Sequence, residues 1–571
     1  TLWHTLSLHD ALPIWLERCS LQPGDRVLFR RGDAWRDQLT VSSPGTADAP
    51  IRYSAYGEGP QPRIAGTVPI TPNRNAIRNF DFAEFRGEID DGQADEFLHF
   101  SAAGGRVEAV SDTPDADRAA ARLSGSKAHL FADIYLPANA RVTLRWKAKS
   151  RIADGAFALR HRLNGTRYLQ ENLQTWSSSD CWRAAPLAGN VEETWRDRSI
   201  SFSTDRYSGK YQLYFISGNT AGDGIATWLD DVRLQIDWER GEGGIYKIGT
   251  GYLPRRLLLK NGQVWQAAEY REPGSGSPQD TLEPGQWTYI PEDGRIYLQW
   301  ENGDPVSAGV AMEISVPENG EQGQCGIYID HPHVAVEGLA VEGWPDDAPT
   351  FNSVGGIAIT DKAHYVSITQ CRVNFNYRVG VYARADYGRF TDNRFSYNGG
   401  SGLVFYGAAR SNRIAGNESS YNGFQGEDSD DGEGIGLGLD TADNVIESNR
   451  IHHNNLNLAS GNHGGLVLYR SNHNVIRYNR IFANTKSGLV VEGDANEVYY
   501  NLVYENGTAA AETDVSITAN LYLRDGSPEG IGSNRVFNNV CYGGVGDVRW
   551  MGNLFVKESL KAAEVRNNVF W

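Results

Sequence analysis

The C-terminal half of the chain repeats a unit of a little more than twenty residues. From Gly355 onward, each unit has a glycine, a short apolar alternation, a turn, an Asn-x-apolar-x-x-Asn segment and a second short strand. The closing positions of successive units are Cys371, Asn393, Asn417, Asn449, Asn479 and Asn501, with spacings of 22, 24, 32, 30 and 22 residues. Strands this short cannot bury a face alone, so they must stack coil on coil. The repeat predicts an all-β fold, a parallel β-helix over 326–571, with an inward asparagine ladder at these positions.

Composition excludes several classes of protein. A chain of 571 residues exceeds one ordinary core, so at least two domains are expected. The net charge of −17 argues against a nucleic-acid partner, because phosphates require a basic surface. No apolar run reaches membrane-spanning length, which argues against a membrane partner. The five cysteines are scattered and odd in number, so they predict neither a metal site nor a disulfide framework.

The first residues do not look like natural protein sequence. Thr5 to Ile14 read TLSLHDALPI, which is a translation of a common sequencing-adapter oligonucleotide. Residues 1–14 are therefore interpreted as an artefact and excluded from the fold prediction. The natural N-terminus is expected to be missing.

The rest of the chain divides by its patterns. Residues 15–76 contain PGDRVLF and PIRYSAY and are predicted to start the β-helix domain. Residues 77–237 alternate apolar and polar residues between turns, which predicts an inserted β-sandwich. Residues 238–325 include two alternating segments about Asp293-Gly294 and are predicted to return to the β-helix domain as a hairpin-rich segment.

These patterns carry resemblances to known families. The coil repeat from Gly326 to Trp571 resembles the pectate-lyase-like superfamily of right-handed β-helices. The opening Asn-Phe-Asp-Phe and the closing Leu-Asp-Asp-Val of the insert resemble jelly-roll carbohydrate-binding modules. The order of β-helix start, jelly-roll insert and long β-helix is similar to β-helix glycosidases, which include β-xylosidases. The resemblance implies a secreted or periplasmic carbohydrate-active protein.

Two coils are longer than the others by eight to ten residues, at the same place. The first excursion is FQGEDSDDGEG (Phe424–Gly434) and the second is NNLNLASGNHG (Asn454–Gly464). Long loops on a rigid scaffold are usually functional, and stacked coils bring these two side by side. The coil edge that carries them is the predicted cleft.

The first excursion is strongly acidic. Its carboxylates are Glu427, Asp428, Asp430, Asp431 and Glu433. Their mutual repulsion raises some pKa values or requires a cation. A carboxyl with a raised pKa suits general acid catalysis at a glycosidic oxygen. A calcium loop that includes Asp428 and a plain solvated loop are the alternatives.

Part of the two excursions resembles a catalytic motif. Asp430-Asp431 followed by Gly461-Asn462-His463-Gly464 resembles the Asp-Asp and Gly-His-Gly motifs of the polygalacturonase family. The resemblance implies that the two aspartates bracket an attacking water and protonate the leaving group. His463 would orient a carboxylate or a sugar hydroxyl, or is an ordinary turn residue. The family's next coil carries Arg-x-Lys, which this chain lacks, so a galacturonate substrate is not predicted.

A second constellation follows from aligning coils on their turn asparagines. Asp440, Arg470 and Glu492 each lie four residues before such an asparagine and are predicted to form one outward column. The outer two would lie about 10 Å apart, a distance that suits inversion. A structural salt-bridge ladder is the alternative. This register would also turn Leu466 and Leu468 outward, which conflicts with their apolar character.

The insert offers candidate ligand-binding residues. Trp176, Trp182 and Tyr168 lie in loop-like sequence and could stack on sugar rings, or they pack in the core. Asp230, with Asp231, could bind a structural calcium ion or is surface charge.

Together these observations favour a glycoside hydrolase with a polysaccharide or oligosaccharide substrate. Acid and base, or nucleophile, are expected among Asp430, Asp431, Glu433 and Asp440, with no required cofactor and a possible structural Ca²⁺. One alternative is a calcium-assisted polysaccharide lyase, for which Arg470, Lys486 and Arg477 are the basic candidates near the cleft. The other is a non-catalytic carbohydrate-binding β-helix or adhesin. The sequence indicates neither the sugar nor the oligomeric state.

Overall fold

The fold is described from a computed structural model. It describes residues 3–6, 20–36, 38–70, 85–86, 96–97, 101–114, 119–125, 127–137, 140–151, 155–161, 166–187, 192–205, 209–217, 226–240, 245–249, 257–261, 264–271, 282–290, 295–300, 310–315, 325–345, 354–423, 432–455, 464–507, 518–524, 533–544, 551–556 and 563–571. Within these ranges every regular element is a β-strand. None of them contains a helix long and apolar enough to cross a membrane.

The chain forms two compact units. One unit joins Thr1–Gly66 to Gly320–Trp571, and the other is Thr67–Asn319. The boundaries differ from the predicted ones, because most of the segment 238–325 groups with the insert and not with the β-helix. The reason lies in its side chains: Ile248, Trp287, Ile296 and Met312 pack in the same hydrophobic cluster as the insert.

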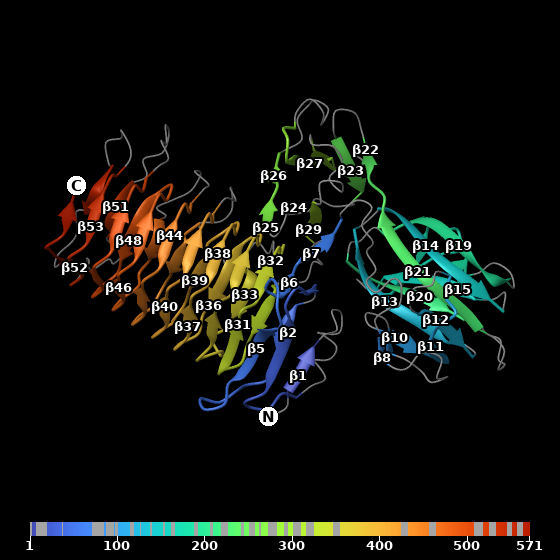
Figure 1. Ribbon diagram of the computed structural model, residues 1–571. Helices are drawn as coiled ribbons and strands as arrows, with labels where there is room; N and C mark the ends of the chain where they lie inside the picture. The colour runs from blue at the N-terminus through green and yellow to red at the C-terminus, as the bar shows by residue number, and fades with distance from the viewer. Residues whose placement is uncertain are drawn as a thin grey trace. The chain divides into compact units, whose positions relative to one another are not determined.

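The first unit is a parallel β-helix made of three sheets. Successive coils add one strand each to sheet C, then sheet A, then sheet B, as in β39 (Leu403–Phe405), β40 (Arg413–Ala415) and β41 (Glu418–Ser420). Each strand pairs in parallel with its counterpart one coil further on, so that Phe405 faces Leu437 and Ile414 faces Ile446. Figure 1 shows the strands stacked in chain order. The predicted fold class, a parallel β-helix, is confirmed.

The three sheets have the following strands. Sheet A contains β1 (Trp3–Leu6), β2 (Arg26–Arg30), β5 (Ile51–Tyr56), β31 (Val334–Glu337), β34 (Ser367–Thr369), β37 (Arg389–Thr391), β40, β43 (Val445–Glu447), β46 (Val475–Arg477), β49 (Glu497–Tyr499), β52 (Arg535–Phe537) and β55 (Glu564–Arg566). Sheet B contains β3 (Ala34–Trp35), β6 (Arg63–Ala65), β32 (Ala340–Glu342), β35 (Arg372–Asn374), β38 (Arg394–Ser396), β41, β44 (Arg450–His452), β47 (Arg480–Phe482), β50 (Leu502–Tyr504), β53 (Val540–Tyr542) and β56 (Val569–Phe570). Sheet C contains β4 (Leu39–Val41), β30 (Ile327–Ile329), β33 (Val354–Ile359), β36 (Val379–Ala383), β39, β42 (Ile435–Leu437), β45 (Gly464–Leu468), β48 (Ser487–Glu492), β51 (Thr518–Arg524) and β54 (Met551–Val556).

The interior is filled by the apolar middle residue of each short strand. The middle residues of β40, β43 and β46 are Ile414, Ile446 and Ile476, each fully buried. Because side chains alternate across a strand, the residues on either side of them point outward. The inward set forms one continuous cluster from Leu21 to Cys541. The alternation of inward and outward residues in each short strand therefore forms the continuous core.

Asparagine ladders line the corners between the sheets. At the corner between sheets A and B, both the backbone N–H and the side-chain amide of Asn417 donate to Oδ1 of Asn449, and Asn449 does the same to Asn479. The predicted inward ladder is confirmed, and two further ladders occupy the other corners. One contains Asn412, Asn444, Asn474, Asn496 and Asn534, and the other contains Asn376, Asn398, Asn422, Asn454, Asn484 and Asn506. The ladders satisfy polar groups that the corners bury.

Left-handed residues make these corners tight. The residue before each of Asn449, Asn444 and Asn454 has a positive φ, between 54° and 59°. That conformation turns the chain within two residues, and Asn then caps the turn from inside.

The N-terminal segment supplies the first coils. β4 pairs in parallel with β30, and β6 pairs with β32, so the β-helix continues across the insert. β1 lies within residues 1–14, the segment interpreted as an artefact, and pairs in parallel with β2. The artefactual origin of that segment stays a prediction.

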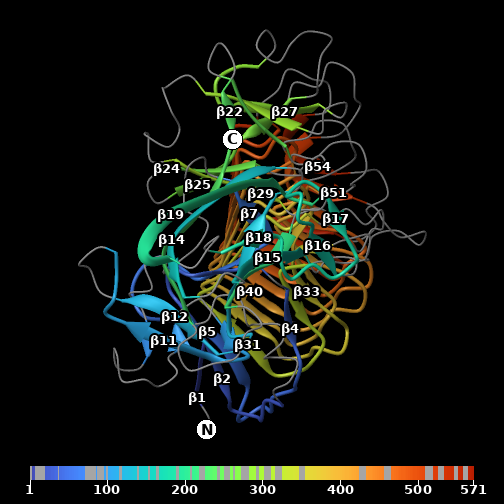
Figure 2. The same ribbon diagram turned by 90° about the vertical axis from the view of Figure 1, so that its right-hand side faces the viewer.

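The second unit contains two antiparallel sheets that share one hydrophobic cluster. Sheet D has the order β10 (Ser101–Ala103), β13 (His129–Leu136), β20 (Gly209–Ile216), β15 (Ala156–His161), β16 (Arg167–Leu169) and β17 (Trp176–Ser177), with β18 (Ala185–Pro186) beside β15. Sheet E has the order β11 (Arg106–Val110), β12 (Ala120–Ser124), β21 (Ala226–Ile236), β14 (Arg141–Ser150) and β19 (Glu192–Ser203). Phe157 and Leu213 of sheet D pack with Leu144 and Leu234 of sheet E. Figure 2 labels β14 and β19 on one side of the insert and β15, β16 and β17 on the other. Jelly-roll topology stays a prediction.

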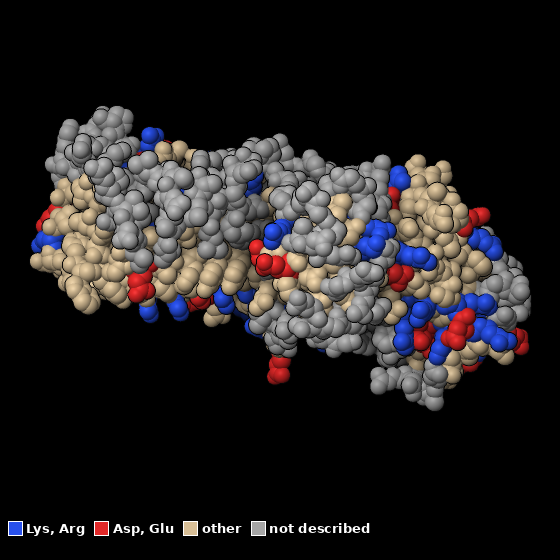
Figure 3. Space-filling model, turned by 90° about the horizontal axis from the view of Figure 1, so that it is seen from above, with Lys and Arg blue, Asp and Glu red and all other residues tan. Residues whose placement is uncertain are grey.

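Smaller sheets complete this unit. One sheet has the order β25 (Val264–Ala267), β24 (Leu257–Asn261), β29 (Ala311–Ser315) and β7 (Thr67–Pro69). Another has the order β22 (Glu239–Arg240), β23 (Ile245–Gly249), β28 (Arg295–Gln299), β27 (Gln286–Ile290) and β26 (Glu269–Tyr270). β8 (Phe85–Arg86) pairs with β9 (Glu96–Phe97). On the face of the insert that Figure 3 presents, at its right-hand end, basic and acidic side chains are interleaved.

Candidate functional site

The two overlong excursions leave the β-helix at the corner between sheets B and C. Asp428, Asp430, Asp431 and His463 lie outside the described residues, so the roles predicted for them stay predictions. The stem of the first excursion is described: a Cβ on Gly423 would come within 2.6 Å of Cα of Gly432. The excursion therefore starts and ends at one point, as a closed loop does.

The second excursion begins beside the stem of the first. The backbone N–H of Asn455 donates to the carbonyl of Gly432 over 3.1 Å, and its side-chain amide donates to the same oxygen over 2.7 Å. The predicted juxtaposition of the two excursions thus holds at their bases.

Glu433 follows the stem and enters sheet C on its outward side. The hydroxyl of Ser401, one coil earlier, donates to Oε2 of Glu433 over 2.5 Å. The backbone N–H of Gly432 donates to the same oxygen over 3.1 Å. Ser401 also accepts the backbone N–H of Glu433, which fixes the direction of its hydroxyl. The two donors converge on one oxygen of this buried carboxylate and hold it in a fixed direction.

The structure places the predicted column of Asp440, Arg470 and Glu492 on neighbouring coils. The N–H of Asp440 donates to the carbonyl of Arg470 over 3.3 Å, and Nε of Arg470 lies 3.9 Å from Oε1 of Glu492. Glu492 is buried and also pairs with Arg524, at 3.1 Å. Asp440 and Arg470 are exposed left-handed turn residues, not strand residues.

That placement removes the conflict in the predicted register. Leu466 and Leu468 point inward and are fully buried, and the turn begins after the strand that contains them. The paired arginines make Glu492 an ion-pair residue, which agrees with the salt-bridge alternative as well as with a catalytic role.

Glu433 and Glu492 lie too far apart to act on one glycosidic bond. Ser487 lies two coils beyond Glu433 in register, and Glu492 follows it by five residues on the same strand. At ~3.3 Å per residue the two backbones are roughly 16 Å apart along the strand direction alone. Catalytic carboxyl pairs are about 5 to 9.5 Å apart. Each glutamate therefore needs a different partner.

The basic candidates of the lyase alternative are scattered. Arg477 points outward from sheet A and pairs with Glu447 over 2.7 Å. Lys486 is buried next to Ser487 at the start of β48. Arg470 is the one of the three that lies beside a predicted carboxylate, Glu492.

In the insert, the structure separates the three aromatic candidates. Trp182 is 41% exposed and meets Tyr168 edge to face, with ring centroids 5.4 Å apart. Trp176 instead packs on Tyr211, and its Nε1 donates to the carbonyl of Ser203 over 2.9 Å. Trp182 therefore stays a candidate for sugar contact, whereas Trp176 has a packing role and Tyr168 is buried in the hydrophobic cluster of the insert.

The calcium candidate of the insert is engaged within the protein. Asp230 is buried on β21, and its Oδ1 accepts the backbone N–H of Asp231, whose φ is 48°. Within the described part of the chain no group of three or more His, Cys, Asp or Glu is arranged to hold a metal ion. The calcium proposals for Asp230 and Asp428 stay predictions.

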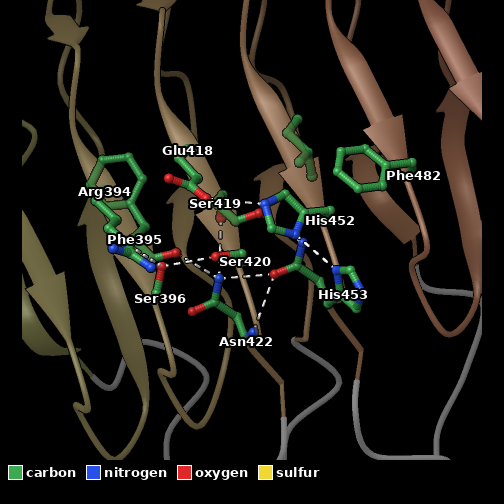
Figure 4. Close-up of polar contacts among 12 residues, drawn as sticks. Arg394, Phe395, Ser396, Glu418, Ser419, Ser420, Asn422, His452, His453 and Phe482 are labelled. Atoms are coloured by element: carbon green, nitrogen blue, oxygen red, sulfur yellow. Dashed lines mark hydrogen bonds and ion pairs between the residues drawn. The ribbon is translucent and has the colours of Figure 1, made fainter. Parts of the chain in front are cut away.

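Sequence reasoning missed an acid–base array on the outward side of sheet B. Nε2 of His452 lies 3.1 Å from Oε1 of Glu418, and Nδ1 of His452 lies 2.9 Å from Nδ1 of His453 (Figure 4). The ring of Tyr421 stacks on His453, with centroids 4.9 Å apart. The signal was present in the coil register: Glu418 directly follows one ladder asparagine, and His452 comes three residues after the next.

The hydrogen bonds fix the tautomers of this array. An ionised Glu418 accepts from His452, so His452 carries its proton on Nε2 and presents a lone pair at Nδ1. His453 must then donate from Nδ1, which leaves Nε2 of His453 as the open acceptor. Burial first, and the charge of Arg450 second, lower the pKa of both imidazoles, while Glu418 acts against this at His452. Both rings are neutral at pH 7.

The lowered pKa of His452 makes stability depend on pH. The unfolded chain takes up this proton below pH ~6.5, before the folded chain does, so stability is lost as the pH falls through that range. His452→Phe should reduce the fall of Tm between pH 7 and pH 5, because it removes the titrating imidazole. Phenylalanine can keep the ring stack that His452 makes with Phe482, whose ring centroid lies 4.7 Å away. Thermal melts at several pH values measure it. His473→Phe, at an exposed turn, is the control, and an unchanged slope in His452→Phe would contradict the assignment.

Comparison with known protein families agrees with the fold. A family model described as "Right handed beta helix region" matches residues 352–524. No protein with a curated description matches the chain in sequence. A solved structure titled "Glycoside hydrolase" is 11% identical and covers 96% of this chain and 89% of its own, with a TM-score of 0.46.

Two further solved structures are similar to part of the chain. The periplasmic alginate epimerase AlgG is 12% identical, covers 43% of this chain and 61% of its own, and has a TM-score of 0.30. An alginate lyase from Paenibacillus sp. is 15% identical, covers 42% of this chain and 77% of its own, and has a TM-score of 0.30. The matched family region, the three parallel sheets and the asparagine ladders together identify the chain as a right-handed parallel β-helix protein with a large insert.

Proposed function

We propose that this chain is a polysaccharide-acting enzyme, a glycoside hydrolase, whose site lies at the corner between sheets B and C. The observation that carries the proposal is Glu433, a buried outward carboxylate at the stem of the acidic excursion, held by Ser401. A buried carboxylate with oriented donors at a loop base is what a catalytic carboxylate needs.

The environments divide the roles among the carboxylates. The donors on Glu433 fix the direction of its carboxylate, which suits a general base or a nucleophile. Asp430 and Asp431 lie in a run of like charges, and repulsion favours the protonated form that a general acid needs. The acid would protonate the glycosidic oxygen while Glu433 activates water or attacks the anomeric carbon.

Glu433→Gln tests the proposal. The variant keeps the hydrogen-bonding shape but removes the charge, so reducing-end release should fall by roughly 10²- to 10⁴-fold. The assay uses a panel of neutral and uronic polysaccharides, with ultraviolet absorbance followed alongside. Glu497→Gln, which changes an exposed ion pair with Arg535, is the matched control and should keep full activity.

Other outcomes would change the assignment. Full activity in a folded Glu433→Gln variant would remove Glu433 from the mechanism. A gain in ultraviolet absorbance would reveal a new double bond and replace hydrolysis by elimination. Turnover of no substrate by the parent chain, with binding retained, would favour a non-catalytic carbohydrate-binding protein.

A further inference from the structure

One outward column of sheet B is rich in arginine. The first residues of β35, β38, β41, β44 and β47 lie in register and are Arg372, Arg394, Glu418, Arg450 and Arg480. Four of these five positions are therefore basic, on a chain whose net charge is −17. We use "arginine column" for Arg394, Arg450 and Arg480.

The arginines of the arginine column have no acidic partner among the described residues. Arg372 is bound to Glu342 over 2.8 Å, but within the described ranges no carboxylate lies within 4.0 Å of Arg394, Arg450 or Arg480. All three are exposed. Glu418, which lies between Arg394 and Arg450, turns to His452 instead (Figure 4).

The column contrasts with two outward arginines on sheet A, Arg413 and Arg477. There Arg413, one coil before Glu447, and Arg477, one coil after it, each form an ion pair with Glu447 over 2.7 Å. Exposed pairs of that kind are satisfied within the fold. The arginine column has the same regular spacing without the acidic counterpart.

Aromatic rings hold two of the guanidinium groups in place. The guanidinium carbons of Arg450 and Arg480 lie 5.4 and 5.0 Å from the centroid of the Phe482 ring. Nε of Arg480 also donates to the hydroxyl of Tyr504 over 2.8 Å. Arg394 is tied more loosely, by Nε to the hydroxyl of Ser396 over 3.4 Å. A guanidinium group that stacks on a ring still has its N–H donors free to point sideways, in the guanidinium plane. Because the side chain is already held in place, it loses little conformational entropy when it binds an anion.

Arg450 has the most donors to offer. Its side chain donates no hydrogen bond to any residue of the described ranges, although a guanidinium carries five N–H groups. The positive charge of Arg450 also lowers the pKa values of His452 and His453, although burial is the larger cause at both. Both imidazoles next to it are neutral, so they offer polar contacts without competing for an anion.

We propose that the arginine column binds a sugar chain that carries carboxylates, an acidic oligosaccharide laid along the axis of the β-helix. Strands of neighbouring coils are about 4.8 Å apart, so Arg450 and Arg480 are roughly one sugar unit apart and Arg394 is two coils from Arg450. Arginine forks match planar carboxylates in two-point contact. Tyr421 and His453 supply hydroxyl and ring nitrogen for sugar hydroxyls.

This proposal deepens the proposed function, because it names an acidic substrate class for the same coils. His453 is two residues before Asn455, which contacts the stem beside Glu433. The proposal rests on the proposed function for the hydrolysis of the bound oligosaccharide, but binding of the oligosaccharide does not depend on it. Binding is therefore measured on the catalytically silenced Glu433→Gln chain, so that failure of binding and failure of hydrolysis are distinguishable.

Titration calorimetry with an oligogalacturonate, an oligomannuronate and a neutral xylo-oligosaccharide tests the column. An acidic oligosaccharide should bind and the neutral one should not, and added salt should weaken the binding. Arg450→Gln/Arg480→Gln should raise Kd about tenfold or more. Arg389→Gln, an exposed arginine on sheet A, is the matched control and should leave Kd unchanged.

The results that would overturn the proposal are equally specific. Equal affinity for acidic and neutral oligosaccharides, or no binding of any acidic one, would overturn it. So would an unchanged Kd in a double variant whose melting curve matches the parent. Equal binding of duplex DNA would mean an unselective polyanion surface and would also overturn it. If the double variant does not fold, Arg450→Lys replaces it, and a Kd raised above the parent's supports the two-point contact, whereas an unchanged Kd overturns it.

Discussion

Asn449→Ala should destabilise the β-helix by roughly 3–6 kcal/mol, the largest effect expected of a single side chain here. Asn449 is fully enclosed in the ladder at the corner between sheets A and B. Its amide donates to the carbonyl of Ile414 over 2.9 Å and to Oδ1 of Asn479 over 3.0 Å, and its Oδ1 accepts both nitrogens of Asn417 over 2.9 Å. Alanine removes these four hydrogen bonds, at about 0.5–1.5 kcal/mol each, and the buried backbone N–H of Asn417 loses its acceptor, which adds to the loss. Denaturant unfolding followed by circular dichroism measures the loss.

The end of the same ladder provides the control. Asn568 makes the corresponding bonds, accepting from Asn539 over 2.9 Å, but it is partly exposed in the last coil. Water can replace its partners, so Asn568→Ala should cost under about 1 kcal/mol. Equal losses at the two positions would mean that burial does not set the strength of the ladder.

Glu342→Gln should cost roughly 3–5 kcal/mol, because it leaves two arginines together without their shared anion. The Glu342 side chain is fully buried, and its two oxygens bind Arg63 and Arg372, each over 2.8 Å. Arg63 is on the last coil before the insert and Arg372 is on a coil after it. The pair of contacts thus stabilises the β-helix where its chain is interrupted. The variant's thermal unfolding midpoint measures the effect.

Glu447→Gln is the matched comparison. Glu447 also bridges two arginines across three coils, but Arg413 and Arg477 are 57% and 36% exposed at their side chains. Solvent screens that triad, so the loss should stay within about 1 kcal/mol. If both variants lose the same free energy of unfolding, the buried ion pairs of Glu342 contribute no more to stability than the exposed ones of Glu447, and the prediction is wrong.

The fold was largely predictable because its determinants are local and periodic. The closing asparagines from Asn393 to Asn501 mark a corner of every coil, and alternation in each short strand marks the inward side. The ladder through Asn412 and Asn444 uses the first asparagine of the same repeated segment. The ladder through Asn376 was harder to foresee, because each of its asparagines alone looks like any turn residue. The predicted boundaries of segment 238–325 differ from the observed ones for another reason. The apolar face of a hairpin is visible in the sequence, but the sequence does not indicate whether that face packs on the insert or on the β-helix.

The candidate site was less predictable, because it depends on contacts between coils. Glu433 was expected from its acidic surroundings, but its bond to Ser401 spans 32 residues and leaves no local trace. Glu418 and His452 are 34 residues apart, and only the coil register makes them neighbours. The column of Asp440, Arg470 and Glu492 was found by aligning turn asparagines. The turn before Asn496 is one residue shorter than in the coil of Arg470 and two shorter than in the coil of Asp440, so Glu492 lies in the strand and is buried.

The interruption of the first coils also sets an order of events during synthesis. Arg52 binds Glu337 over 2.6 Å, and these partners are 285 residues apart in the chain. At about 5–20 residues per second, a ribosome needs roughly 15–60 s to deliver the second partner after the first. Strands β4, β5 and β6 pair with strands that follow the insert, so each has an unpaired edge through that time, while the insert is already complete. The N-terminal coils are therefore the part of the nascent chain most dependent on protection by a chaperone.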